Sequence, residues 1–180
     1  MTRFSASTES VAVVAADRSA IWRALTDPDL LPRLTPLLRR VDVDTSVDTS
    51  VDTDADGDRW RWHLVGIDVL GVGISPVFTE RMRFTPESRI DYTHEPPPGV
   101  VEQAGAEGSY ELSDAPAGTR LAIRLALHVE LPLPRLAGPA VRRVMEATMR
   151  VMGDRFAANL LEHLAREEAA STDLPVSSRS

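Results

Sequence analysis

The chain has 180 residues, of which 43% are hydrophobic and 26% are charged, a size and balance that suit one globular domain with its own core. It contains no cysteine, which excludes disulfides, thiolate metal sites and cysteine nucleophiles and favours a reducing, cytoplasmic location. The net charge of −7 matches seven aspartates within residues 41–58, and the rest of the chain is balanced, so no basic surface for nucleic acid is expected. The sequence shows no signal peptide and no membrane span.

The first elements are predicted from periodicity and helix-capping signals. Residues 1–8 are expected to be flexible, and residues 9–16 are expected to form the first strand. An aspartate at the N-cap position precedes apolar residues at helical spacing, so a short helix follows. The Asp27-Pro28 pair ends that helix and begins a second short helix through Leu31.

Residues 41–53 alternate Val or Thr with Asp or Ser, and this period of two is typical of a long strand. The Asp56-Gly57 dipeptide after it is a signal for a two-residue hairpin loop. This loop predicts four cross-strand pairs: Asp54 with Arg59, Asp52 with Arg61, Thr53 with Trp60 and Val51 with Trp62.

Four further strands are predicted, at residues 77–84, 88–95, 103–113 and 119–131. The last of them alternates apolar with polar or small residues, so one face is dry and the other wet, as in an antiparallel sheet. A long helix with one apolar stripe is expected to begin near Pro139. Residues 169–180 are small and polar and are expected to be disordered.

A sheet of this length with one long amphipathic helix buries both apolar faces by curling round the helix, so an α+β helix-grip fold is predicted. The segment VAVVAADRSAIWRALTDP at residues 11–28, followed by Leu34 and Pro36, resembles the opening of the START-like (SRPBCC) superfamily. That superfamily includes polyketide cyclases and dehydratases, coenzyme Q-binding lipid chaperones and plant hormone receptors. The resemblance implies a ligand-binding domain over residues 9–168, with a mostly apolar cavity between the sheet and the C-terminal helix.

Strand alternation predicts which side chains face such a cavity. The ligand-binding candidates are Trp60, Trp62, Phe78, Met82, Tyr92 and Tyr110 on strands and Met145, Met149 and Met152 on the long helix. Glu80 and His94 are the candidate catalytic residues, because burial raises the pKa of a carboxyl group and imidazole transfers protons near neutral pH.

Each of these assignments has an alternative. Glu80 is also consistent with a place at the sheet end, paired with Arg81 or Arg83, or with an outward position after a one-residue slip of the register. His94 is equally consistent with an exposed rim before a proline-rich turn. A methionine stripe is also typical of an ordinary core.

Metal sites are not supported by the sequence. Residues 52–57 imitate the start of a calcium-binding EF-hand loop, but His63 stands where that loop needs a bidentate Glu. The four histidines are dispersed without ligand spacing, so we predict neither a metal nor a cofactor. The apolar connections at residues 69–74 and 131–136 suggest a gate that contacts a membrane transiently, or else a bulge and a buried corner.

Two functions follow from these features. The favoured one is binding or transport of a hydrophobic small molecule, such as a lipid, an isoprenoid or a polyketide, by a monomer or homodimer. The alternative is a polyketide cyclase or dehydratase in which Glu80 and His94 act as acid and base and Tyr92 and Tyr110 donate hydrogen bonds. A protein-binding role for the Asp-rich segment remains a third interpretation.

Overall fold

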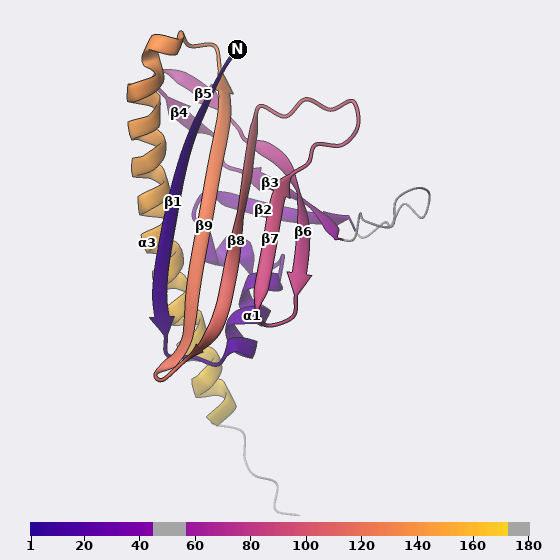
Figure 1. Ribbon diagram of the computed structural model, residues 1–180, viewed down its shortest axis with the longest axis vertical. Coiled ribbons are helices and arrows are strands. Elements are labelled where there is room, and N and C mark those ends of the chain that lie inside the picture. The colour runs from indigo at the N-terminus through magenta and orange to yellow at the C-terminus, as the bar shows by residue number, and fades with distance from the viewer. Residues whose placement is uncertain (45–56, 173–180) are drawn as a thin grey trace, which may run out of the picture.

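The computed structural model describes residues 1–44 and 57–172 and shows a curved sheet with a long helix beside it (Figure 1). The elements are β1 (Thr2–Val14), α1 (Arg18–Thr26), α2 (Leu31–Leu34), β2 (Leu38–Asp44), β3 (Asp58–Leu64), β4 (Ile67–Val69), β5 (Val72–Ile74), β6 (Val77–Thr85), β7 (Arg89–His94), β8 (Ala104–Ala115), β9 (Gly118–Leu131), η1 (Arg135–Ala137) and α3 (Gly138–Thr172). The described strands form an antiparallel sheet in the order β1-β9-β8-β7-β6-β3-β2, with β4 and β5 as a separate pair. The predicted α+β helix-grip fold is confirmed.

The first strand begins seven residues earlier than predicted. Residues 2–8, which we expected to be flexible, are part of β1 and pair with the second half of β9, from Thr2 opposite Leu131 onward. Phe4 and Ala6 alternate into the core, and each is 7% exposed. The sequence prediction was wrong here because the apolar members of this stretch are separated by Ser and Thr, which weakens the periodic signal.

The predicted pairing of β3 was also wrong. Its neighbour on one side is β2, which ends at Asp44, and the observed pairs are Val41 with Trp62, Asp42 with Arg61, Val43 with Trp60 and Asp44 with Arg59. The observed register differs from the predicted one by ten residues, an even number, so Asp still faces Arg and a Val or Thr position of the alternating pattern still faces Trp. Alternation alone therefore did not distinguish the two registers. Residues 45–56, which include positions 45–53 of the predicted strand and Asp56 of the hairpin loop, lie outside the described residues, whereas positions 41–44 belong to β2.

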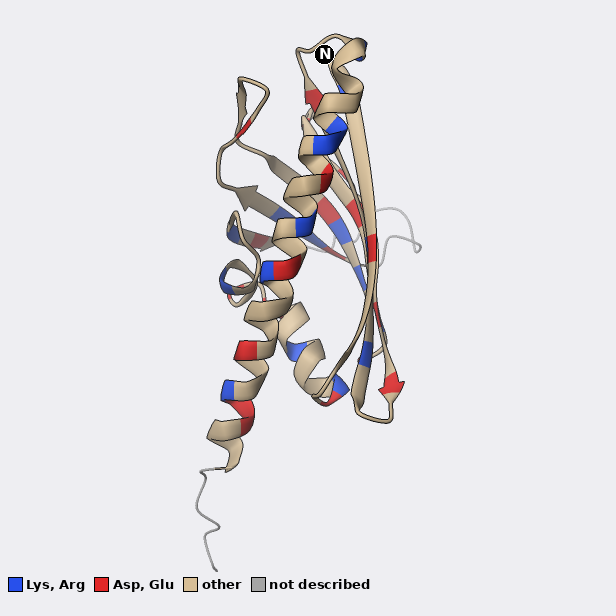
Figure 2. Ribbon diagram, turned by 90° about the vertical axis from the view of Figure 1, so that its left-hand side faces the viewer, with Lys and Arg blue, Asp and Glu red and all other residues tan. Residues whose placement is uncertain are grey.

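The long helix α3 runs alongside β1 in Figure 1, and Figure 2 shows it on one side of the curved sheet with charged residues spaced along its length. Its buried stripe consists of Val141, Met145, Met149, Phe156, Leu160 and Leu164. The helix continues to Thr172, so residues 169–172 are helical and not disordered, while residues 173–180 lie outside the described part.

Three apolar clusters fill the space between sheet and helices. The first joins α1, α2 and the end of α3 to Trp60, Met82 and Tyr92. The second packs the β4-β5 pair through Val69 onto the first half of α3, and the third surrounds Phe78. Leu125 on β9 packs against all three clusters and is still only half-buried, so the middle of the inner sheet face is incompletely covered.

Each of the two apolar connections combines a buried residue with an exposed one. Residues 69–74 form the β4-β5 turn, where Val69 is buried and Leu70 is 49% exposed. In the other connection Leu131 is completely buried and Leu136 is 92% exposed. Within residues 1–44 and 57–172, no helix is both long and apolar enough to cross a membrane.

Candidate functional site

Glu80 lies on β6, on the inner face of the sheet, and is 3% exposed. In the sheet register it stands opposite Trp60 on β3 and opposite His94 on β7. Burial raises the pKa of its carboxyl group well above the ordinary value of 4.5, because the charged form loses its hydration. The indole of Trp62 opposes this rise in pKa. Glu80 is therefore a buried carboxyl group that favours its neutral, proton-carrying form.

Tyr92 and Tyr110 stand next to this carboxyl group. Their ring centroids are 5.7 Å apart, and the Tyr92 hydroxyl donates a hydrogen bond of 2.7 Å to the backbone carbonyl of Arg124. Burial raises the pKa of both phenols, and the charge of Glu80 adds to the rise in each. Among the described residues, the ring of Tyr110 packs against Tyr92, and no hydrogen bond joins its hydroxyl to another side chain or to the backbone.

Trp60 and Trp62 form the β3 side of the same cluster. Their ring centroids are 6.0 Å apart, and Phe84 lies 5.7 Å from Trp60. Both indole N–H groups are buried, and the Trp60 N–H has no hydrogen-bond acceptor within the described part of the chain. The Trp62 N–H interacts with the Glu80 carboxyl group and so lowers its pKa, although the two groups do not form a hydrogen bond of good geometry.

The remaining apolar candidates are distributed over the inner surface. Met82 packs with Trp60 in the first cluster, Met145 and Met149 belong to the second, and Phe78 centres the third. Met152 is half-buried and belongs to none of the three clusters of described residues. Met145 and Met149 therefore pack in a different cluster from Trp60, Met82 and Tyr92.

His94 is engaged elsewhere, although it stands opposite Glu80 in the register. Its Nε2 is 3.0 Å from a Glu102 carboxylate oxygen, and its ring packs edge-on against His128 at 4.8 Å between centroids. The Glu102 side chain is only 4% exposed and also accepts hydrogen bonds from the Thr79 backbone N–H and hydroxyl, at 2.7 Å and 2.8 Å. The predicted acid-base pair is thus divided between two sites.

Sequence reasoning did not identify Glu102 or His128. Glu102 stands in the loop before β8, where a single carboxylate carries no positional signal. His128 was assigned to the wet face, but it is 8% exposed, and burial lowers its pKa, with Arg3 and His94 contributing. The available signal was Gly105, because a side chain there would overlap both imidazole rings, and a glycine inside a strand indicates a close approach.

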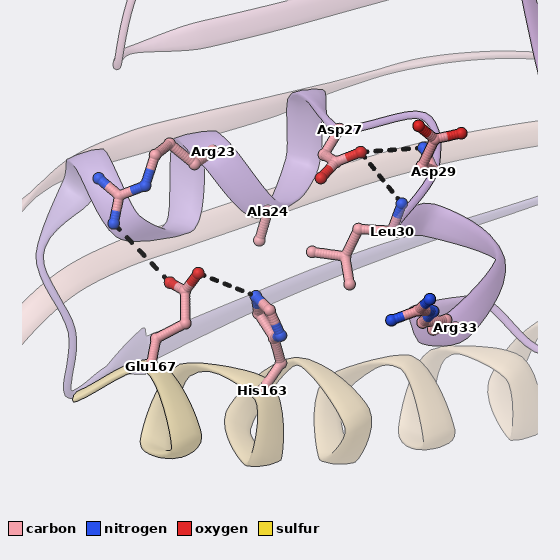
Figure 3. A pocket seen from close by; sticks show the side chains of 8 residues that line it. All are labelled: Arg23, Ala24, Asp27, Asp29, Leu30, Arg33, His163 and Glu167. Carbon is pink, nitrogen blue, oxygen red and sulfur yellow. Dashed lines mark hydrogen bonds and ion pairs between the residues drawn. The ribbon is translucent and has the colours of Figure 1, made fainter. Parts of the chain in front are cut away.

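Two surface pockets lie apart from the inner face. One of about 260 Å³ opens between β5-β6 and the β7-β8 loop, and one of about 350 Å³ lies between α1, α2 and α3 (Figure 3). In the larger pocket, Glu167 is 3.7 Å from Arg23 and 3.5 Å from His163, and the Asp27 carboxylate accepts two backbone N–H bonds. The Arg23–Glu167 ion pair joins α1 to α3, and the Asp27 carboxylate caps the turn between α1 and α2.

In the described part of the chain, no group of three or more His, Cys, Asp or Glu side chains is arranged to hold a metal ion.

The chain matches one family model and several solved structures. The family model is described as polyketide cyclase / dehydrase and lipid transport and matches residues 3–162. Zhui aromatase/cyclase from Streptomyces sp. R1128 superposes with a TM-score of 0.67 at 16% identity, covering 94% of this chain and 99% of that one. The two-domain aromatase/cyclase StfQ from the steffimycin biosynthetic pathway superposes with a TM-score of 0.62 at 16% identity, covering 93% of this chain and 53% of that one.

A protein from Nitrosomonas europaea superposes with a TM-score of 0.57 at 19% identity, covering 91% of this chain and 96% of that one. No curated protein sequence matches the chain. At these identities the structural likeness establishes the fold alone. The family model spans most of the chain, and the chain therefore belongs to the polyketide cyclase/dehydrase and lipid transport family.

Proposed function

We propose that the inner face of the sheet binds a hydrophobic small molecule, such as a polyketide, an isoprenoid or another lipid. The observation that carries this proposal is the half-buried Leu125 at the junction of all three apolar clusters, next to aromatic side chains. Apolar surface with a few convergent polar groups is typical of small-molecule sites. The proposal includes action in the cytoplasm, and exposed Leu70 and Leu136 support a transient membrane contact during ligand exchange.

The test is native mass spectrometry of the protein purified from its own host, followed by organic extraction. We expect a bound hydrophobic compound that the extraction releases. Leu125→Trp fills the inner face and should abolish the bound mass, while Ala126→Trp, on the neighbouring outward position of β9, should retain it. Circular dichroism confirms that both variants fold. A protein that carries no hydrophobic compound and binds none on incubation with a lipid extract would refute the proposal.

A second candidate function is that of a cyclase or dehydratase, and the observation that favours it is the buried carboxyl group of Glu80, whose pKa burial raises, beside the Tyr110 ring. A neutral carboxyl group acts as a general acid. In a dehydration, Glu80 would donate its proton to the leaving β-hydroxyl group, which would depart as water. The resulting Glu80 carboxylate would then accept the α-carbon proton as the carbon–carbon double bond forms, and this transfer would restore the neutral carboxyl group. The relatives named as aromatase/cyclases make this chemistry a reasonable assay target.

The test uses a synthetic β-hydroxyketone whose dehydration creates an absorbing enone. We expect Glu80→Gln to abolish turnover and Tyr110→Phe to reduce it. Because His94 is hydrogen-bonded to Glu102, His94→Ala measures separately whether the histidine takes part. Equal turnover in the wild type and in Glu80→Gln would remove this function from consideration.

A further inference from the structure

The helix α3 carries a second row of apolar side chains that the described chain does not bury. Its buried stripe faces the sheet and runs from Val141 to Leu164. On the opposite side of the helix, apolar residues recur at intervals of three, four or seven positions, and all of them are exposed. This outer stripe consists of Ala140, Ala147, Val151, Ala158, Leu161 and Ala165. A helix face that only contacts water carries polar and charged residues, so the outer stripe requires an explanation.

Helix propensity does not explain the outer stripe. Alanine is favourable at any exposed helix position, but valine is not, because a helix restricts its branched side chain. Val151 is 52% exposed and Leu161 is 51% exposed, so both present apolar surface to water. Residues of the stripe repeat every seven positions, as from Val151 to Ala158 to Ala165, which is the spacing by which two helices pack along each other. The outer stripe therefore has the pattern of a surface that receives a second helix.

Charge is unevenly distributed along α3. Residues 138–153 contain three arginines and one glutamate, whereas residues 154–172 contain four acidic residues and two arginines. Figure 2 shows this order, with basic residues more frequent in the upper half of the helix and acidic residues in its lower half. All three arginines of the first half are exposed, and no acidic side chain among residues 1–44 and 57–172 forms an ion pair with Arg142, Arg143 or Arg150. The two halves of the helix therefore carry opposite net charge.

We infer that the outer stripe binds the same stripe of a second copy of this chain, with the two α3 helices antiparallel. An antiparallel arrangement places the basic half of each helix against the acidic half of the other, whereas a parallel arrangement places like charges together. In the register that matches the stripe to itself, Ala147 lies opposite Ala158 of the second copy, and Arg150 lies beside Asp154 of the second copy. The outer stripe points away from the sheet, so this pairing does not depend on the proposed function.

The size of the outer stripe predicts a weak dimer. Residues 140–165 span about 38 Å at the rise of an α-helix. The alanines allow the two helix axes to approach to about 8 Å. One pair of helices in contact over this length buries less than the area of about 1,600 Å² that a stable complex has. We therefore expect a dissociation constant on the order of 10 to 100 µM.

Sedimentation velocity of the full chain, at protein concentrations from about 5 to about 500 µM, tests the self-association. We expect a monomer at the lowest concentration and a dimer at the highest. Val151→Glu should weaken the dimer at least about tenfold, because it brings a second carboxylate next to Asp154 of the other copy in an apolar contact. Val13→Glu on β1 is the matched control, since Val13 is 55% exposed, and it should leave the dimer unchanged.

Introduced cysteines test the orientation, because the chain has none of its own. An equal mixture of Ala147→Cys and Ala158→Cys should form a disulfide-linked dimer on mild oxidation. Either variant alone should not, because identical positions of an antiparallel pair in this register lie about 16 Å apart along the axis, which is too far for a disulfide. In a parallel pair, by contrast, each variant would link to itself.

Three results would overturn the inference. One is a protein that stays monomeric up to the highest concentration. Another is a dimer that Val151→Glu leaves intact and Val13→Glu weakens, since such a dimer would form through β1 and not through α3. The third is a disulfide-linked dimer from Ala147→Cys alone, which would mean that the helices are parallel. None of these results bears on ligand binding at the inner face.

Discussion

The buried carboxyl group of Glu80 makes stability depend on pH in a way that one substitution removes. Its pKa is raised in the folded protein and returns to about 4.5 in the unfolded chain. Above pH 4.5 the folded state therefore keeps a proton that the unfolded state releases. The contribution of Glu80 to the unfolding free energy is fully present below pH 4.5 and falls as the pH rises toward the folded pKa. Glu80→Gln keeps the shape of the side chain and cannot ionise.

The magnitude follows from the linkage between protonation and folding. Over the pH window above 4.5, the wild type should lose about 1.4 kcal/mol of unfolding free energy per pH unit relative to Glu80→Gln. The loss stops at the folded pKa, above which the difference between the two proteins is constant. The assay is urea unfolding followed by tryptophan fluorescence, repeated from about pH 4 to about pH 8. Subtracting the two stability curves cancels all other titrating groups.

The control is Glu146→Gln, which removes an exposed carboxylate from the outer side of α3. Its stability curve should run parallel to that of the wild type. Parallel curves for Glu80→Gln and the wild type would refute the reasoning, because they would mean that Glu80 ionises equally easily in the folded and unfolded states. A constant offset between the curves carries no such meaning, since the buried amide of Gln has its own pH-independent effect.

Three further substitutions test other parts of the structure. Two arginines lower the pKa of Glu95 to about 2. Glu95→Gln should therefore lower the unfolding free energy by about 1 kcal/mol at neutral pH, a figure that allows for solvent screening of this partly exposed group. Urea unfolding should show this difference vanish as the pH falls from 4.5 to 2. Gly108→Ala would overlap the Tyr92 hydroxyl and a β9 carbonyl, so thermal unfolding should show a loss of about 1–3 kcal/mol, whereas Gly73→Ala, with open space around it, serves as the comparison. Leu160→Ala empties a site that is 2% exposed and should cost about 2–5 kcal/mol by urea unfolding; a loss below about 1 kcal/mol would mean that α3 is loosely packed there.

Much of the inner face was predictable because a strand places alternate residues on opposite faces. Trp60, Glu80 and Tyr92 stand at positions of the same parity in strands whose apolar residues are easily recognised, and the structure brings them together. The buried stripe of α3 was predictable because apolar residues three or four positions apart lie on the same face of a helix. In the strands and in α3 alike, the direction of the side chains repeats with a fixed period, and the hydrophobic residues of the sequence follow the same period.

The partners of those residues depended on the tertiary structure. His94 ends β7, so alternation no longer constrains the chain beyond it, and the following loop brings Glu102 to its ring. The residue that pairs with Arg59 from the neighbouring strand was ambiguous, because two registers that differ by an even number of residues place the same residue types opposite each other.

The sequence by itself therefore determined the alternation that places Trp60, Glu80 and Tyr92 on one face, since alternation depends on the period of each strand, but it did not determine the position of His94. Only the tertiary structure decided that Glu80 loses its hydration and that the Trp60 indole N–H has no acceptor among the described residues. Desolvation and hydrogen-bond satisfaction depend on every group packed around an atom, and those groups come from strands and helices far apart in the chain.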